Sequence, residues 1–104
     1  MLTDTITSIR SSKDIPFFWE VAEDSKIRNM KDFIKNCSYL LFRSVSLSDD
    51  GLVFTNIHIF HDESMFELFL KEIMSDPARS DYVNEARAYE KENDIIHICD
   101  IKTS

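Results

Sequence analysis

The side chains that could do chemistry in this chain are few. Its 104 residues include three histidines, two cysteines and a single glycine, which follows two aspartates in a turn and leaves nothing for a Gly-rich phosphate loop. No serine lies in a nucleophile elbow or in a recognisable order with a histidine and an acid. The sequence therefore argues against nucleotide hydrolysis and triad chemistry, and it assigns no catalytic residue.

His58 and His61 have the H-x-x-H spacing that can hold a metal ion. They lie at the end of a run with strand character, where side chains three positions apart point to opposite faces of a sheet. If His61 has already left the strand, this objection weakens. The favoured interpretation is one sheet histidine and one loop or helix-cap histidine, with no shared ion.

His58 and His97 could instead share one face of a sheet. If another strand lies between theirs, the two backbones are roughly 10 Å apart, because neighbouring strands are spaced by about 4.8 Å. Two histidines alone make a poor metal site, and a third ligand would have to come from Asp4, Asn56 or a partner subunit. We therefore expect no metal and no cofactor.

A run of bulky apolar residues, Ile15-Pro16-Phe17-Phe18-Trp19, stands where the chain should leave its first strand. As a functional feature it would be a lid or wall over a pocket for an apolar ligand. As a structural feature it would plug the end of the sheet or build a subunit interface, where Trp and Phe are frequent anchors. The plug or interface is the favoured interpretation.

Acidic residues gather near the C-terminus, but basic residues interrupt them. The acids are Glu85, Glu90, Glu92 and Asp94, and Arg87 and Lys91 stand among them. Mixed charges at helical spacing are typical of a solvated helix face. Paired catalytic carboxylates are the less favoured interpretation.

The overall charge limits the class of partner. There are 12 Lys and Arg against 19 Asp and Glu, which gives a formal charge of −7. The basic residues are spaced among acids rather than gathered in one patch, so we expect neither nucleic acid nor an anionic membrane as partner.

The cysteines and the short apolar runs indicate the cellular compartment of the protein. Cys37 and Cys99 have apolar neighbours and make neither a disulfide framework nor a zinc set, so they are predicted to be buried, reduced thiols. The longest apolar runs fall far short of the ~20 residues that span a bilayer. The first residues carry Asp4 and no apolar signal-peptide core, so we expect a cytoplasmic protein.

The elements that must position these residues follow from hydrophobic periodicity. Apolar residues at three- and four-residue steps predict helices near residues 25–37, 62–75 and 77–92, the last opened by Asp76-Pro77 as N-cap and first helical residue. Asp24 or Ser25 would cap the first of these. Asp62 and Ser64 offer capping oxygens to the second, and Ser64 with Glu67 fits a capping box. Strands are predicted at Thr3–Arg10, Tyr39–Leu47, Leu52–Phe60 and Ile95–Ile101, with the middle two joined as a hairpin by Asp49-Asp50-Gly51.

This order predicts a single α+β domain over residues 1–104. The βαββαβ arrangement, with its second helix split, gives a four-stranded antiparallel sheet of ferredoxin-like topology that carries its helices on one face. Both faces of the third strand carry apolar side chains. A sheet face that is apolar and uncovered usually meets another sheet, so a homodimer through the helix-free face is expected.

With these features the chain resembles the dimeric α+β barrel family that includes antibiotic-biosynthesis-monooxygenase-like proteins. The hairpin Tyr39–Phe60, the helix at His61–Ser75 and the closing strand carry the resemblance, which covers nearly the whole chain. It implies a fold in which two sheets pack face to face. The segments Ile6–Arg10, Ile15–Phe18 and Ala86–Tyr89 are also similar to small uncharacterised proteins of marine tailed bacteriophages, a likeness that implies no reaction.

The first resemblance also suggests where a ligand would bind. Enzymes of this family that act on aromatics or haem place polar or aromatic side chains in the barrel mouth. Here the candidate ligand-binding residues are Trp19, Asn56, His58 and His97. No residue-by-residue match to a family motif supports them.

Three functional hypotheses remain at this point. The leading one is a non-catalytic, cytoplasmic homodimer that works through its shape, such as a bacteriophage accessory protein. The second is a monooxygenase-like oxidoreductase, in which Trp19, Asn56 and His58 line a cavity for a flat apolar substrate. The third is a protein that binds such a ligand without chemistry.

Overall fold

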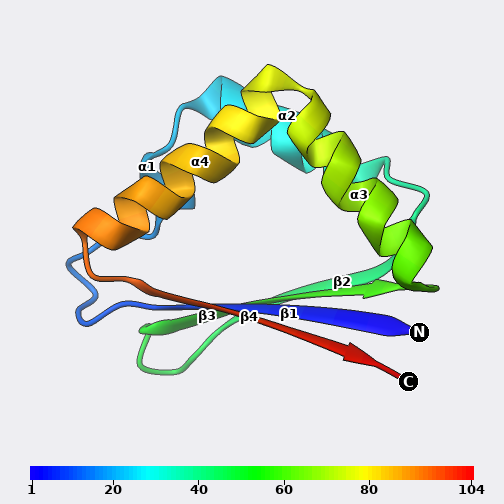
Figure 1. Ribbon diagram of the computed structural model, residues 1–104. Coiled ribbons are helices and arrows are strands. Elements are labelled where there is room, and N and C mark those ends of the chain that lie inside the picture. Colours follow the sequence, from blue (N-terminus) through cyan, green and yellow to red (C-terminus); the bar gives the residue numbers. More distant parts are fainter.

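The computed structural model describes residues 1–104. Four strands and four helices follow one another in the order β1 (Leu2–Ile9), α1 (Phe18–Val21), α2 (Asp24–Lys35), β2 (Leu40–Leu47), β3 (Val53–Phe60), α3 (Glu63–Ser75), α4 (Pro77–Glu92) and β4 (Ile96–Thr103). The strands form one sheet, and the helices form an arch over one of its faces (Figure 1).

The sheet is antiparallel throughout, with strand order β2-β3-β1-β4. The first and third strands are therefore central, and the predicted ferredoxin-like topology is confirmed. The only helix that the sequence did not predict is the single turn α1, within the bulky apolar run.

The hairpin turn depends on its glycine. Gly51 has a φ of 75°, a left-handed conformation that costs other residues free energy. Asp50 fixes the same turn, because its carboxylate accepts hydrogen bonds from the Leu52 amide at 3.0 Å and the Ser48 hydroxyl at 2.6 Å. The predicted turn at Asp49-Asp50-Gly51 is thus where the chain reverses.

Aspartates open the two long helices that follow. Asp62 accepts from the Met65 amide at 2.9 Å, and Asp76 accepts from the Ala78 amide at 3.0 Å with Pro77 as the first helical residue. The capping box predicted for α3 at Ser64 is wrong, because Asp62 occupies the N-cap position. The caps predicted for α2 are also wrong: the N-cap is Glu23, which makes no side-chain capping bond.

The helix layer and the sheet close on each other at one end. There Leu2 and Phe60 from the central strands meet Phe66 and Phe69 of α3 in the buried hydrophobic cluster. The Phe60 ring centroid lies 5.2 Å from that of Phe66 and 5.0 Å from that of Phe69. Only 12 of the 104 residues are buried, so most of the remaining interface between the layers is less tightly packed.

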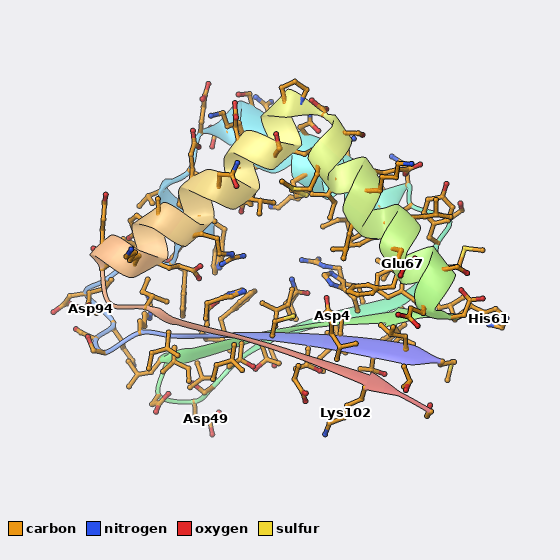
Figure 2. The ribbon with its side chains drawn as sticks, in the orientation of Figure 1. Asp4, Asp49, His61, Glu67, Asp94 and Lys102 are labelled. Carbon is orange, nitrogen blue, oxygen red and sulfur yellow. The ribbon has the colours of Figure 1, made fainter.

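The other face of the sheet carries no helix (Figure 1). Strand pairing assigns to it Thr3, Thr5, Thr7, Ile9, Phe42, Val53, Thr55, Ile57, Ile59, Ile96 and Ile98, together with Ser44, Ser46, Asp100 and Lys102. Figure 2 shows Lys102 on this side. The face is thus a mixture of branched apolar side chains and threonines, and nothing in the protomer covers it. We call it the open face.

The helices and the two cysteines bear on two further predictions. None of the helices has both the length and the apolar character that crossing a bilayer requires. Cys37 is half-buried, but Cys99 is exposed on the edge strand β4. The prediction that both thiols are buried is therefore wrong for Cys99, because no helix covers the part of β4 that carries it.

The cluster around Phe60 should dominate stability. Phe60→Ala is expected to lower the free energy of unfolding by about 3 to 5 kcal/mol in urea denaturation, because the ring is fully buried, with 0% exposed. The matched control Leu68→Ala removes a side chain that is 39% exposed on α3 and should cost less than about 1 kcal/mol. Equal losses for the two variants would contradict the assigned core.

Candidate functional site

A cavity lies between α2 and the sheet. The helix is amphipathic, and Phe33 and Ile34 of its apolar stripe pack against the core cluster. None of its residues is fully buried, because the rest of the stripe faces the cavity. The space measures about 340 Å³ and is lined by Ile27, Met30, Lys31 and Ile34 of α2, Arg43, Val45, Phe54 and Asn56 of the sheet, and Trp19 and Tyr82. That volume is within the range of small-molecule sites.

The cavity continues under α4 as a smaller lobe of about 150 Å³. Trp19, Phe54, Asn56 and Tyr82 line both lobes, so the two are contiguous. The smaller lobe adds polar groups to the lining, namely Ser8, Arg87, Glu90 and His97. The site therefore has an aromatic middle and one polar end.

The bulky apolar run forms the aromatic wall. The Phe17 ring is buried, and the Trp19 ring stacks on it at a centroid distance of 6.2 Å with an interplanar angle of 11°. Both rings contact Phe54 on β3, at 5.7 Å and 5.5 Å. Trp19 is 44% exposed, so it stands at the edge of the cavity. The run thus plugs one end of the sheet and also serves as the wall of a pocket, which was the less favoured interpretation.

Arg10 fixes this wall from below. Its guanidinium lies 4.2 Å from the centroid of the Phe17 ring, donates from Nη1 to the Ile15 carbonyl at 2.9 Å and donates from Nε to the Gly51 carbonyl at 2.8 Å. From above, the Tyr89 hydroxyl donates to the Pro16 carbonyl at 2.6 Å. The position of Trp19 is consequently tied to β1, the hairpin turn and α4.

Asn56 gives the cavity an unused hydrogen-bond acceptor. Its side chain comes from the middle of β3, and its Oδ1 atom is buried without any partner in the chain. A buried amide oxygen without a partner is costly, so such an atom calls for a donor from a ligand or water.

A cluster of charged side chains closes the polar end. Glu90 of α4 is buried, accepts from the Ser8 hydroxyl at 3.2 Å and pairs with Arg87. Arg87 Nη1 also lies 2.9 Å from His97 Nδ1, and His97 Nδ1 lies 3.8 Å from Glu90 Oε1. The prediction that Glu90 belongs to a solvated helix face is therefore wrong. Its backbone carbonyl also accepts from the Ile95 amide at 2.8 Å, which turns the end of α4 back onto the sheet.

His97 is held in its neutral form by this environment. Partial burial and then the positive charge of Arg87 lower the pKa of His97, while Glu90 acts in the opposite direction. Since Arg87 can only donate, the His97 Nδ1 atom accepts from it, and we infer that the ring proton lies on Nε2. In this state the ring offers a ligand a donor and has no free nitrogen to act as a base.

His58 lies in a separate, buried place, where neither of its ring nitrogens has a hydrogen-bond partner. It is buried between aromatic rings, with the Phe69 centroid 5.6 Å away, and its Nδ1 lies 3.9 Å from Asp4 Oδ2. The Cys99 thiol donates to the other oxygen of Asp4 at 3.2 Å, and partial burial followed by this bond raises the pKa of Cys99 to about 11. Cys99 is therefore a thiol at neutral pH and a poor nucleophile.

The predicted ligand-binding residues are thus divided in space. Trp19, Asn56 and His97 line one contiguous cavity, whereas His58 is outside its lining. The cavity lies beneath the helices and not on the open face, because all three sheet residues among the four point to the helix side. No group of three or more His, Cys, Asp or Glu side chains is arranged to hold a metal ion.

The fold is shared with solved structures of oxygenases. SnoaB, a cofactor-independent oxygenase from Streptomyces nogalater, matches with a TM-score of 0.64 and 14% identity over 99% of this chain and 91% of its own. An antibiotic biosynthesis monooxygenase matches with a TM-score of 0.64 and 10% identity over 100% and 98%.

The same fold occurs in a dimeric protein of unknown function from Bacteroides fragilis. It has a ferredoxin-like fold and matches with a TM-score of 0.51 and 13% identity over 99% of this chain and 96% of its own. No protein-family model matches the sequence, and no curated protein matches it either. The fold expected from the resemblance is therefore confirmed, and at these identities nothing beyond the fold follows.

The charge environment of His97 makes its titration a test of the cluster. We expect an NMR titration to place the pKa of His97 below the ordinary histidine value of about 6.5. Arg87→Gln should raise this pKa, because a nearby positive charge is lost, and Glu90→Gln should lower it further.

The same shift predicts a pH dependence of stability. A histidine with a lowered pKa in the folded state binds protons more readily when unfolded, so its contribution is complete above the unfolded pKa and is lost as pH falls. The urea midpoint should therefore decrease from pH 7 to pH 5, and less steeply in His97→Asn than in the control His61→Asn, whose side chain is exposed. Identical slopes in the two variants would contradict the assignment.

Proposed function

We propose that this protein binds a flat apolar ligand in the cavity between α2, α4 and the sheet. The observation that carries the proposal is the unpartnered Asn56 Oδ1 atom within a cavity walled by Trp19, Phe54 and Tyr82. A planar ligand could stack among these rings while a hydroxyl or N–H group of the ligand donates to Asn56. The Nε2 atom of His97 would supply a donor at the polar end.

Oxygenation of the bound ligand is the second candidate. It is favoured by the fold shared with SnoaB, which is a cofactor-independent oxygenase. Such chemistry relies on a reactive substrate within a shaped apolar cavity, and the cavity here has that character. A purely non-catalytic role, such as that of a bacteriophage accessory protein, and a cytoplasmic location stay predictions.

We further propose that the protein is a homodimer joined through the open face. Phe42, Ile96 and Ile98 on this face are 54%, 56% and 47% exposed in the protomer. These side chains lie on the two edge strands, with Ile57, Ile59 and several threonines between them. Exposed apolar side chains on one face are typical of an interaction surface, and the face-to-face meeting of two sheets would bury them. The dimeric protein of the same fold supports this arrangement.

Asn56 provides the sharpest test of the cavity. In a thermal-shift screen against haem, flavin and aromatic polyketides, we expect at least one compound to raise the Tm of the wild type. Asn56→Ala should abolish or greatly reduce that shift, because the ligand loses its acceptor. The control Thr55→Ala changes the neighbouring residue, which points to the open face, and should keep the shift.

A shift that survives Asn56→Ala unchanged would rule out the assigned site. For any compound that binds, oxygen consumption with a hydroxylated or quinone product would establish oxygenation. Binding without product would leave ligand binding as the function.

The dimer is tested by sedimentation. At micromolar concentration we expect a wild-type dimer, and Ile98→Glu should shift it to a monomer, because two carboxylates would be buried in the interface. Leu68→Glu places the same change on the outer side of α3 and should leave the dimer intact. A monomeric wild type would overturn the assembly proposal without affecting the cavity.

A further inference from the structure

The edge strand β2 contains an irregularity that faces the cavity. Its pairing with β3 shifts between Leu40 and Phe42, so that Leu40 lies opposite Phe60 and Arg43 lies opposite His58. Without this register shift, Leu41 would lie opposite Ile59, Phe42 would lie opposite His58 and Arg43 would point to the open face. The bulge therefore places a cation on the helix-covered side and turns an aromatic ring outward.

Arg43 does not stand alone at this edge. A hollow adjoining the cavity is lined by Lys31, Ile34, Lys35, Leu40 and Arg43, and it contains three cations and no acid. Lys31 and Arg43 also line the main lobe of the cavity, which has no acid either. The three cations thus surround the mouth between α2 and β2.

Five of the 12 basic side chains lie near a carboxylate, and the three cations at the mouth are not among them. Arg10, Lys26, Arg79, Arg87 and Lys102 each lie within 4.0 Å of a carboxylate. Lys31, Lys35 and Arg43 make neither an ion pair nor a side-chain hydrogen bond. Lys13, Arg28, Lys71 and Lys91 form no ion pair either. In a chain with 19 acids against 12 basic residues, the distinctive feature is that three cations line one hollow that contains no acid.

The Arg43 side chain is exposed at the mouth, although neighbouring atoms screen part of it from water. Burial lowers the pKa of its guanidinium, and no carboxylate offsets this cost, although the group stays charged at any physiological pH. Glu20 and Asp24 line a different hollow near the start of α2, which they share with Arg28 and Lys31. Arg43 is thus a cation prepared for an anion that the protomer itself does not provide.

From this geometry, and resting on the proposed function, we infer that the ligand is amphipathic and carries an anionic group such as a carboxylate. Arg43, with Lys31 and Lys35, holds the anion at the mouth, and the flat apolar body extends inward to Trp19, Phe54 and Asn56. A guanidinium binds a carboxylate through two parallel hydrogen bonds, which would orient the ligand as well as attract it. The class of ligand is therefore a free aromatic or other apolar acid.

Two fluorescent probes that differ by one anionic group test this inference. 1-Anilinonaphthalene-8-sulfonate carries a sulfonate, and N-phenyl-1-naphthylamine is its neutral counterpart. We expect the wild type to bind the sulfonate more tightly. The double variant Lys31→Gln/Arg43→Gln should weaken sulfonate binding about fivefold or more while leaving the neutral probe unchanged.

The matched control removes two positive charges at positions away from the cavity. Lys71→Gln/Lys91→Gln changes exposed lysines of α3 and α4 that do not line the cavity, so its sulfonate affinity should remain that of the wild type. Equal weakening in both double variants would mean a general charge effect and would overturn the inference. Equal affinity of the wild type for the two probes would overturn it too.

A cavity-filling variant separates this inference from the proposed function. Val45→Phe places a ring in the main lobe and should weaken both probes, whereas Leu47→Phe, on the same side of β2 but outside the lining, should weaken neither. If Val45→Phe weakens binding of the neutral probe but Lys31→Gln/Arg43→Gln leaves sulfonate binding unchanged, the cavity is supported and the proposed anion site is wrong. If Val45→Phe affects neither probe, the ligand cavity itself is wrong.

Discussion

The packing of Phe60 against Phe66 and Phe69 is the contact on which the rest of this structure depends. It is the one place where buried hydrophobic side chains of the helix layer and of the sheet form a continuous cluster. The helix α3 is held tightly there, and α3 and α4 form an arch over the sheet (Figure 1). The cavity lies between α2, Tyr82 of α4 and the sheet. The apolar stripe of α2 is accordingly divided: Phe33 packs against Phe69 of the core, whereas Ile27 and Met30 line the cavity.

The hollow end has a distinct distribution of polar groups. Asn56 presents an acceptor in the aromatic middle, the cluster of Arg87, Glu90 and His97 closes one end, and Arg43 stands at the mouth. Asn56 Oδ1 has no hydrogen-bond partner in the chain, and Arg43 has no ion-pair partner. His97 uses one ring nitrogen with Arg87, which leaves the other for a ligand. A protein interior usually satisfies its own polar atoms, so this pattern is better suited to a guest molecule than to packing alone.

Sequence periodicity predicted most of the fold, because strands and helices bury side chains at different intervals. The hairpin at Gly51, the Asp76-Pro77 helix start and the central positions of β1 and β3 all followed from local patterns. Glu90 could not be predicted to be buried, because its neighbours are charged and only the turn of α4 onto β4 brings it beside Ser8 and His97.

The candidate site was predictable only in part for the same reason. Trp19 stood out by its bulk, and Asn56 and His97 by their strands, but the space between them depends on how far α2 stands above the sheet. The bulge that aims Arg43 also has no signal in residue order, since a one-residue shift in pairing reverses which face a side chain occupies.

Ligand binding in the cavity beneath the helices is tested most directly by locating the residues that an aromatic molecule contacts. Intermolecular NOEs should be recorded between N-phenyl-1-naphthylamine and the isotope-labelled protein. We expect cross-peaks from the probe rings to Trp19, Phe54 and Tyr82. Cross-peaks confined to Thr5 and Ile57 on the open face, with none to the three aromatic residues, would contradict this prediction.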